Sequence, residues 1–130
     1  MTLLMLQMGR VVAGLLLMVT LNVAGAVETR RVGGALVTSW DGAMGGFTLA
    51  PFAFVGIYPE WRREYERHEV GHVAQAWDMG RGYLAVEVLS LAFATGCTVA
   101  MIAGADTIDW YDRLPWELDA TRRGRALDRD

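Results

Sequence analysis

The run HEVGH at residues 68–72 holds the residue types needed for hydrolysis at a metal ion. In an α-helix, residues i and i+4 lie on one face, so His68 and His72 can present two imidazole nitrogens to one ion at about 2.0–2.1 Å. Glu69 can reach a metal-bound water, whose pKa the ion lowers toward about 7, and take its proton. The motif therefore predicts a zinc site with His68 and His72 as ligands and Glu69 as general base.

The chain has 2 histidines, and both fall inside this motif. A bare HExxH match also arises by chance, and it then marks two surface histidines and an ordinary Glu on an amphipathic helix. The exclusive placement of the histidines favours the metal site.

Catalytic zinc normally takes three protein ligands and leaves one position open, so a third donor is needed. Glu117 is the first choice, because a Glu on a later helix can complete a site whose first helix carries HExxH. Asp78 is the alternative, six residues after His72 as in the extended peptidase motif, although Gln75 stands where that motif has a glycine. The weaker candidates are Asp119, Asp109 and Glu87.

The residues around the motif predict a helix over 60–79. Pro59 precedes it, the acidic Glu60 and Glu64 lie near its start, and Gly80 follows its end. These are helix start and stop signals, and both histidines fall on one face of the expected helix.

Two long apolar segments, at about 3–27 and 83–104, predict a protein embedded in a membrane, because each is long enough to span a bilayer. The first is interpreted as an anchor. A cleaved signal peptide is the alternative, since Ala24-Gly25-Ala26 fits a cleavage site, and cleavage after Ala26 would leave a secreted soluble protein.

Glu87 is the one charge in the second apolar segment. It is expected to pair with Arg81 near the interface, and the alternative is that it holds a histidine tautomer. If residues 83–104 cross the bilayer, the chain must return to bring Glu117 to the histidines. The twelve residues after Gly104 can span about 40 Å at about 3.3 Å each.

The expected fold is mainly α, a single membrane-associated domain over 1–130 with about two transmembrane segments. Residues 28–59 are expected to form a loop and then a short extended stretch, at most an edge strand, because Pro51 interrupts any ladder. Residues 105–130 are expected to form a polar tail in which Trp110, Tyr111 and Trp116 anchor at the interface.

Composition excludes several kinds of chemistry. All 12 basic residues are arginines, so lysine catalysis is excluded, and the net charge of -3 with no aromatic-basic face argues against nucleic acid as a partner. Cys97 is the only cysteine, so neither an intrachain disulfide nor a cysteine metal site is expected.

The chain also resembles a group of small bacterial integral-membrane proteins that look like minimal zinc metallopeptidases. The resemblance is carried by TLAPFAF, HEVGHVAQ, the apolar segment and PWELDATRRG, over roughly residues 47–124. It implies His68 and His72 as ligands, Glu69 as base and Glu117 as third ligand, in the bacterial inner membrane. Thr121 stands after Ala120 where the group has an Asp, which leaves the role of the displaced Asp119 open.

The sequence therefore predicts a membrane-bound zinc metallopeptidase acting on a peptide or protein substrate. The alternative is a non-catalytic membrane protein that acts through helix-helix contacts, with HEVGH structural or incidental. Because 130 residues enclose an active site poorly, a homo-oligomer or a partner membrane protein is expected besides the lipid bilayer.

Overall fold

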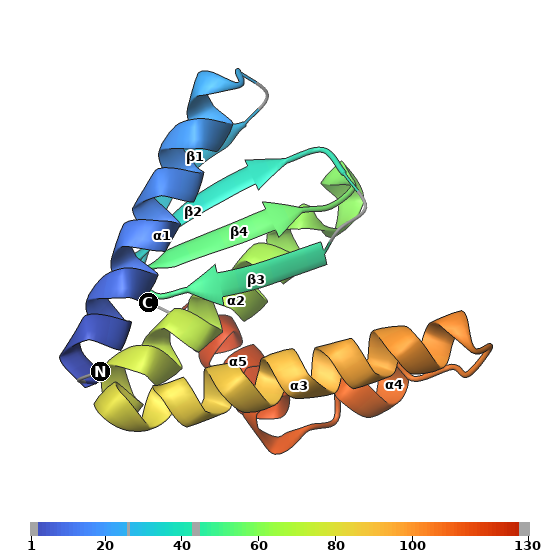
Figure 1. The fold of residues 1–130 in the computed structure, drawn as a ribbon. Coiled ribbons are helices and arrows are strands. Elements are labelled where there is room, and N and C mark those ends of the chain that lie inside the picture. The colour runs from blue at the N-terminus through green and yellow to red at the C-terminus, as the bar shows by residue number, and fades with distance from the viewer. Residues whose placement is uncertain (1–2, 26, 43–44, 128–130) are drawn as a thin grey trace.

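The computed structural model describes residues 3–25, 27–42 and 45–127, and it combines a small sheet with a larger helical part (Figure 1). Ala26, after which cleavage is the alternative, lies outside the described residues. The elements, in chain order, are α1 (Leu3–Val23), β1 (Glu28–Val32), β2 (Ala35–Trp40), β3 (Gly45–Leu49), β4 (Phe52–Gly56), α2 (Pro59–Met79), the 3-10 turn Gly80–Gly82, α3 (Tyr83–Ile102), α4 (Ile108–Tyr111) and α5 (Pro115–Ala126).

The four strands form one sheet in the order β1-β2-β4-β3. β1 and β2 are an antiparallel hairpin in which Val32 pairs with Ala35, and Gly33 between them has a φ of 56° that suits glycine. β4 pairs in parallel with β2 and antiparallel with β3. The expectation of a loop followed by at most an edge strand was wrong, because Pro51 lies in the turn between β3 and β4 and leaves both ladders intact.

The two faces of the sheet are covered by different helices. The inner face packs on α2 through a buried cluster of small and branched side chains, which are Ala35, Val37, Ala53, Val55, Val70 and Val73. Side chains alternate along a strand, so Phe52 and Phe54 of β4 point to the outer face. There the ring of Phe54 stacks on Phe47 at 4.9 Å, and Phe52 lies against Gly14 of α1.

α2 carries the HEVGH motif and agrees closely with the predicted helix over 60–79. Pro59 occupies its first turn, where its missing N–H costs nothing, and Gly80 ends it with a φ of 53° while its N–H bonds to the carbonyl of Ala76. α5 crosses α2 at very close range: a Cβ added to Gly124 would lie 2.0 Å from the carbonyl oxygen of Arg67.

α3 agrees with the second predicted apolar segment, and the chain after it doubles back (Figure 1). Phe93 of α3 lies 5.4 Å from Trp110 and 5.6 Å from Trp116, between ring centroids. Thr107 Oγ1 donates to the carbonyl of Cys97 at 3.3 Å. This return brings the start of α5 back to α2, so Glu117 does not end on the far side of α3.

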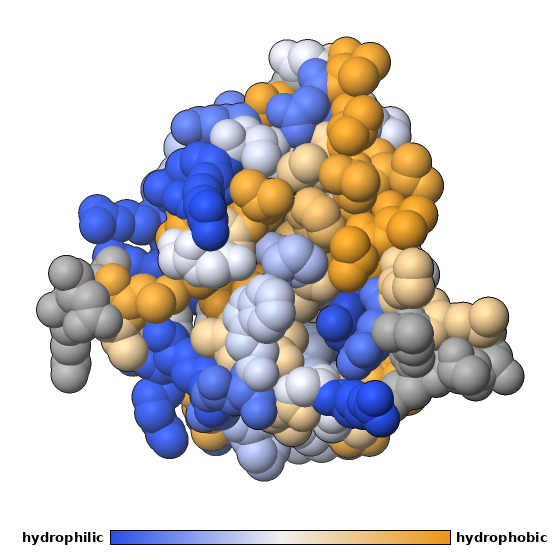
Figure 2. Space-filling view, turned by 90° about the vertical axis from the view of Figure 1, so that its left-hand side faces the viewer, coloured by the Kyte–Doolittle hydropathy of each residue, from blue (hydrophilic) through white to orange (hydrophobic). Residues whose placement is uncertain are grey.

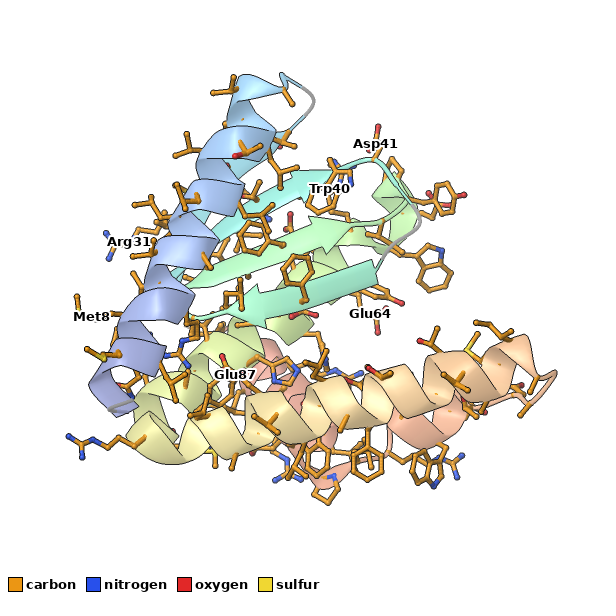
Figure 3. The ribbon with its side chains drawn as sticks, viewed as in Figure 1. Met8, Arg31, Trp40, Asp41, Glu64 and Glu87 are labelled. Carbon is orange, nitrogen blue, oxygen red and sulfur yellow. The ribbon has the colours of Figure 1, made fainter. Side chains whose placement is uncertain are left out.

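Two parts of the described chain are long and apolar enough to cross a bilayer: Met5–Val23, and a stretch within Pro59–Ile102 whose charge-poor part is α3. α1 and α3 meet where Arg10 Nη1 lies 3.1 Å from Glu87 Oε1 and then run in different directions (Figure 1). Figure 3 shows Glu87 in the first turns of α3. The expected pairing of Glu87 with Arg81 was wrong, because α1 brings Arg10 to this carboxylate instead.

Candidate metal centre

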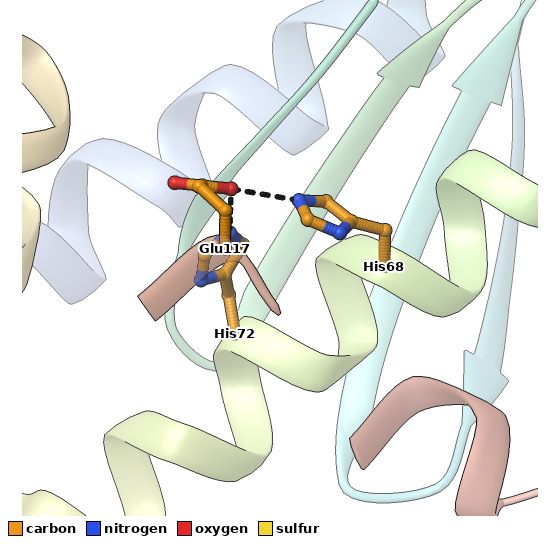
Figure 4. A group of neighbouring side chains, drawn as sticks. All are labelled: His68, His72 and Glu117. Carbon is orange, nitrogen blue, oxygen red and sulfur yellow. Dashed lines mark hydrogen bonds and ion pairs between the residues drawn. The ribbon is translucent and has the colours of Figure 1, made fainter. Parts of the chain in front are cut away.

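His68, His72 and Glu117 converge on one point between α2 and α5 (Figure 4). Glu117 Oε2 lies 3.0 Å from His68 Nε2 and 3.1 Å from His72 Nε2, and the three ligand atoms all lie within 4.8 Å of one another. Ligands of a tetrahedral zinc ion with bonds of about 2.1 Å are about 3.4 Å apart. The two distances from Glu117 Oε2 to the histidine nitrogens therefore need to open by only a few tenths of an ångström to suit such an ion.

The hydrogen bonds of His72 determine what its Nε2 atom can do. Its Nδ1 lies 2.8 Å from Gln75 Oε1, which can only accept, so Nδ1 carries the proton and donates. On a neutral ring Nε2 then holds a lone pair, and it faces the carboxylate of Glu117. Two acceptors at this distance require a cation between them, either a proton on His72 or a metal ion.

The orientation of Gln75 is itself fixed by its neighbours. Its Nε2 lies 2.8 Å from the carbonyl oxygen of Trp116 and 2.8 Å from Asp119 Oδ2, both acceptors, so the amide nitrogen must face α5 and the oxygen must face His72. Asp119 Oδ2 also accepts from Arg123 Nε at 2.7 Å. These bonds to Gln75 and Arg123 hold the pKa of Asp119 below its usual range.

Thr121 orients the ring of His68, as Gln75 orients the ring of His72. Thr121 Oγ1 lies 2.9 Å from His68 Nδ1, which leaves Nε2 directed at Glu117. Thr121 thus contacts His68 directly, while Asp119 contacts the other histidine only through Gln75. His68 keeps 26% of its side chain exposed, so the centre can be reached from solvent.

Glu69 lies beside the two histidines, 5% exposed, and under β3. Thr48 Oγ1 of β3 donates to Glu69 Oε2 at 2.7 Å. Gly46 is so close that an added Cβ would lie 2.5 Å from Glu69 Oε1, so a larger residue here would displace the Glu69 side chain. Burial raises the pKa of Glu69, and the two histidines and Thr48 oppose this only in part.

The contacts between Glu117 and the two histidines favour the charged forms of Glu117 and His72. Burial of Glu117 is outweighed by its hydrogen bonds to His68 and His72, which lower its pKa to about 2. Burial of His72 is likewise outweighed by the hydrogen bond to Glu117 and the charge of Glu69, so the pKa of His72 is raised. A carboxylate that is ionised across the physiological range is what a cation site needs.

Two further side chains contact the ligand Glu117. Ser90 Oγ of α3 lies 3.5 Å from its Oε1. Tyr111, which was expected to be an interfacial anchor, lies near the same carboxylate, and burial together with the charge of Glu117 raises the pKa of Tyr111. Residues of α3 and α4 thus surround the Glu117 carboxylate.

The other candidates for the third ligand lie elsewhere. Asp78 pairs with Arg123 and keeps 65% of its side chain exposed, and Asp109 is exposed. Asp119 contacts Gln75 and Arg123. The acid of α3, Glu87, pairs with Arg10 in place of a histidine.

Sequence reasoning missed three residues of the centre. Gln75 had a usable signal, since it follows His72 by three residues and so lies on the same helix face. Thr121 and Thr48 had none, because their roles depend on packing of α5 and β3 onto α2. No protein-family model, curated protein or solved structure matches the chain.

Proposed function

We propose that the protein is a membrane-associated zinc metallopeptidase with His68, His72 and Glu117 as ligands and Glu69 as general base. The observation that carries the proposal is the convergence of His68, His72 and Glu117, whose ligand atoms lie within 4.8 Å of one another. Gln75 accepts from Nδ1 of His72 and so leaves its Nε2 directed at the Glu117 carboxylate, where a metal ion could replace a proton.

Bound zinc supplies a Lewis acid and lowers the pKa of a coordinated water toward about 7. Glu69 is placed to take the proton of that water and to pass it to the departing amine. Its raised pKa suits both steps, because a carboxylate with a pKa nearer to the working pH accepts a proton more readily and keeps it until the leaving group needs it.

The position of β3 favours a peptide as substrate. β3 is an edge strand on the side of the sheet nearer to α3 (Figure 1), and its second edge is not paired within the described sheet. Gly46 and Thr48 of this strand touch Glu69. An extended peptide that hydrogen-bonds to such an edge would place its backbone carbonyls beside the general base.

Metal content tests the ligand set. We expect near-stoichiometric zinc in detergent-purified natural protein, and a loss of most of it in His72→Ala and in Glu117→Ala. Asp78→Ala is the matched control, since it removes the rival carboxylate and should keep its zinc. Zinc that survives Glu117→Ala but not Asp78→Ala would show that the assignment is wrong.

Glu69→Gln separates the enzyme from the non-catalytic alternative. Glu69 is not a proposed ligand, so the variant should keep its zinc and lose peptidase activity. The activity is measured as cleavage of a mixed peptide library, detected by mass spectrometry. A natural protein that holds zinc and cleaves no more than Glu69→Gln would favour a structural metal site.

A further inference from the structure

Large apolar side chains are exposed mainly on two helices. On α3 the exposed fractions reach 60% for Val88, 70% for Leu91, 61% for Val99 and 83% for Ile102. On α1 they reach 62% for Leu16 and 82% for Val23. Side chains of this kind on a folded surface need an apolar partner.

The two helices lie on the same side of the molecule. In Figure 1 both lie nearest the viewer, α1 in front of the sheet and α3 in front of α5. Figure 2, seen from the side on which α1 lies, shows apolar residues gathered along the upper part of one flank and hydrophilic residues on the other flank. The arrangement in Figure 1 directs both helices toward the same side of the molecule.

α1 packs against the rest of the protein along its length. Gln7 and Met8 line a cleft with Pro51 and Trp77 near one end of α1. Near its other end, Asn22 Nδ2 donates to Thr29 Oγ1 of β1 at 2.8 Å. If α1 crossed a bilayer in this position, the strands beside it would lie at bilayer depth.

The strand next to the end of α1 is strongly charged. β1 contains Glu28, Arg30 and Arg31, and Figure 3 shows Arg31 and Met8 pointing outward beside α1. A charged side chain at the centre of a spanning segment costs about 2.5–3.5 kcal/mol on insertion scales. The packing of α1 beside this charged strand thus disfavours a crossing.

The same reasoning applies to α3. The segment that returns along it contains Asp106, Asp109 and Asp112, and all three are exposed. A crossing α3 would take these carboxylates into the hydrocarbon. An α3 that lies along the surface keeps them in water, on the side opposite to the lipid.

We propose that α1 and α3 form one lipid-binding face and lie along the surface of a bilayer, so that neither crosses it. The occupant of the face is a phospholipid bilayer. Trp77, which is 67% exposed and lines the cleft beside α1, is suited to its interface. This arrangement replaces the two transmembrane segments expected from the sequence, and it does not depend on the metal centre.

Labelling of single cysteines tests the arrangement. In a Cys97→Ser background, the variants Gln7→Cys, Glu64→Cys and Asp106→Cys are reconstituted in sealed phosphatidylcholine and phosphatidylglycerol vesicles and treated with an impermeant maleimide. We expect all three to react from the same side. Reaction of Asp106→Cys from the side opposite to Glu64→Cys overturns the placement of α3, and the same result for Gln7→Cys overturns that of α1.

Depth measurements add a second, independent test. Fluorophores on Leu91→Cys and Val99→Cys should be quenched more by a nitroxide near the headgroup than by one at the end of the acyl chain. Leu118→Cys on α5, 49% exposed in the natural protein, is the matched control and should be quenched by neither. Strongest quenching of Leu91→Cys by the deep nitroxide, or quenching of all three alike, overturns the proposal.

Discussion

Gly71 of α2 lies so close to Ala120 of α5 that a Cβ added to the glycine would come within 1.9 Å of the alanine carbonyl oxygen. Gly71 is the one glycine of HEVGH and directly precedes His72, and Ala120 follows Glu117 by three residues. The contact sets the distance between the helix with the histidines and the helix with the carboxylate. The glycine of the motif is therefore a spacer for the third ligand.

Gly71→Ala should separate α2 from α5 and weaken the centre. The new methyl group meets backbone, which cannot rotate away, so we expect a stability loss of about 1–3 kcal/mol or more and a loss of most bound zinc. Thermal unfolding and metal content measure the two effects. Gly96→Ala on α3 is the matched control, because nothing lies within 4 Å of its added Cβ. A Gly71→Ala protein with natural zinc content would contradict the spacing role.

Gln75→Ala should lower the zinc affinity by about 10–100-fold, the usual effect of removing the partner that orients a ligand histidine. The ring of His72 would lose its acceptor, and the carbonyl of Trp116 would lose its donor. Competition with a chromophoric chelator gives the dissociation constant. Asp119→Asn, which leaves Gln75 in place, should have a smaller effect, and an equal effect of both variants would mean that Gln75 has no special part.

Thr48→Val should change the pH dependence of hydrolysis. The hydroxyl of Thr48 lowers the pKa of Glu69, so its removal raises that pKa further. A base works only when deprotonated, and the acidic limb of the kcat/KM profile should therefore move to higher pH, with a several-fold loss below it and little change above it. A limb that stays in place, or moves to lower pH, would contradict Glu69 as the base.

The metal-free protein should be most stable in a weakly acidic window. The pKa of His72 is raised above 6.5, so its contribution to stability is complete below pH 6.5 and is lost as the pH rises through the raised value. The pKa of Glu117 is lowered from 4.5 to about 2, so its contribution is present above pH 4.5 and is lost toward pH 2.

Thermal unfolding in chelator from pH 4 to 8 measures this window, which Glu117→Gln should flatten. Zinc affinity should show the opposite trend and rise with pH through the same range, because the ion must displace the proton of His72. A zinc affinity that does not depend on pH would contradict the pairing of His72 with Glu117.

The three long helices could be predicted because their signals are local. Pro59 and Gly80 mark the ends of α2 within one residue, and an apolar run with a single charge suffices for α3. The expectation of a polar tail over 105–130 was wrong, because α4 forms there and α5 packs on α2. The sheet was missed for two reasons. Gly33 and Gly34 are a recognisable hairpin turn, but Arg30 and Arg31 beside it suggested a loop. The parallel pairing of β2 with β4 has no local signal at all, because β3 lies between them in the sequence.

The sequence predicted the residues proposed to bind the metal, and it did not predict the side chains that hydrogen-bond to them. The spacing of His68 and His72 follows from helix geometry, and Glu117 followed from the need for a third ligand. The chain returns along α3, and this return decides which carboxylate lies beside the histidines. Such tertiary packing has no local signal in the sequence. The pairs Gln75 with His72 and Thr121 with His68 likewise exist only once α5 packs on α2.

The junction of His72 with Glu117 also closes a loop of 45 residues that contains all of α3. A permanent cross-link over a loop of this length removes about 4 kcal/mol of chain entropy from the unfolded state. A bound ion would act as such a cross-link for as long as it stays bound. Loss of the ion would release the histidines from Glu117. The segment between α2 and α5 would then become more mobile, and α3 would be the first part of the chain to do so.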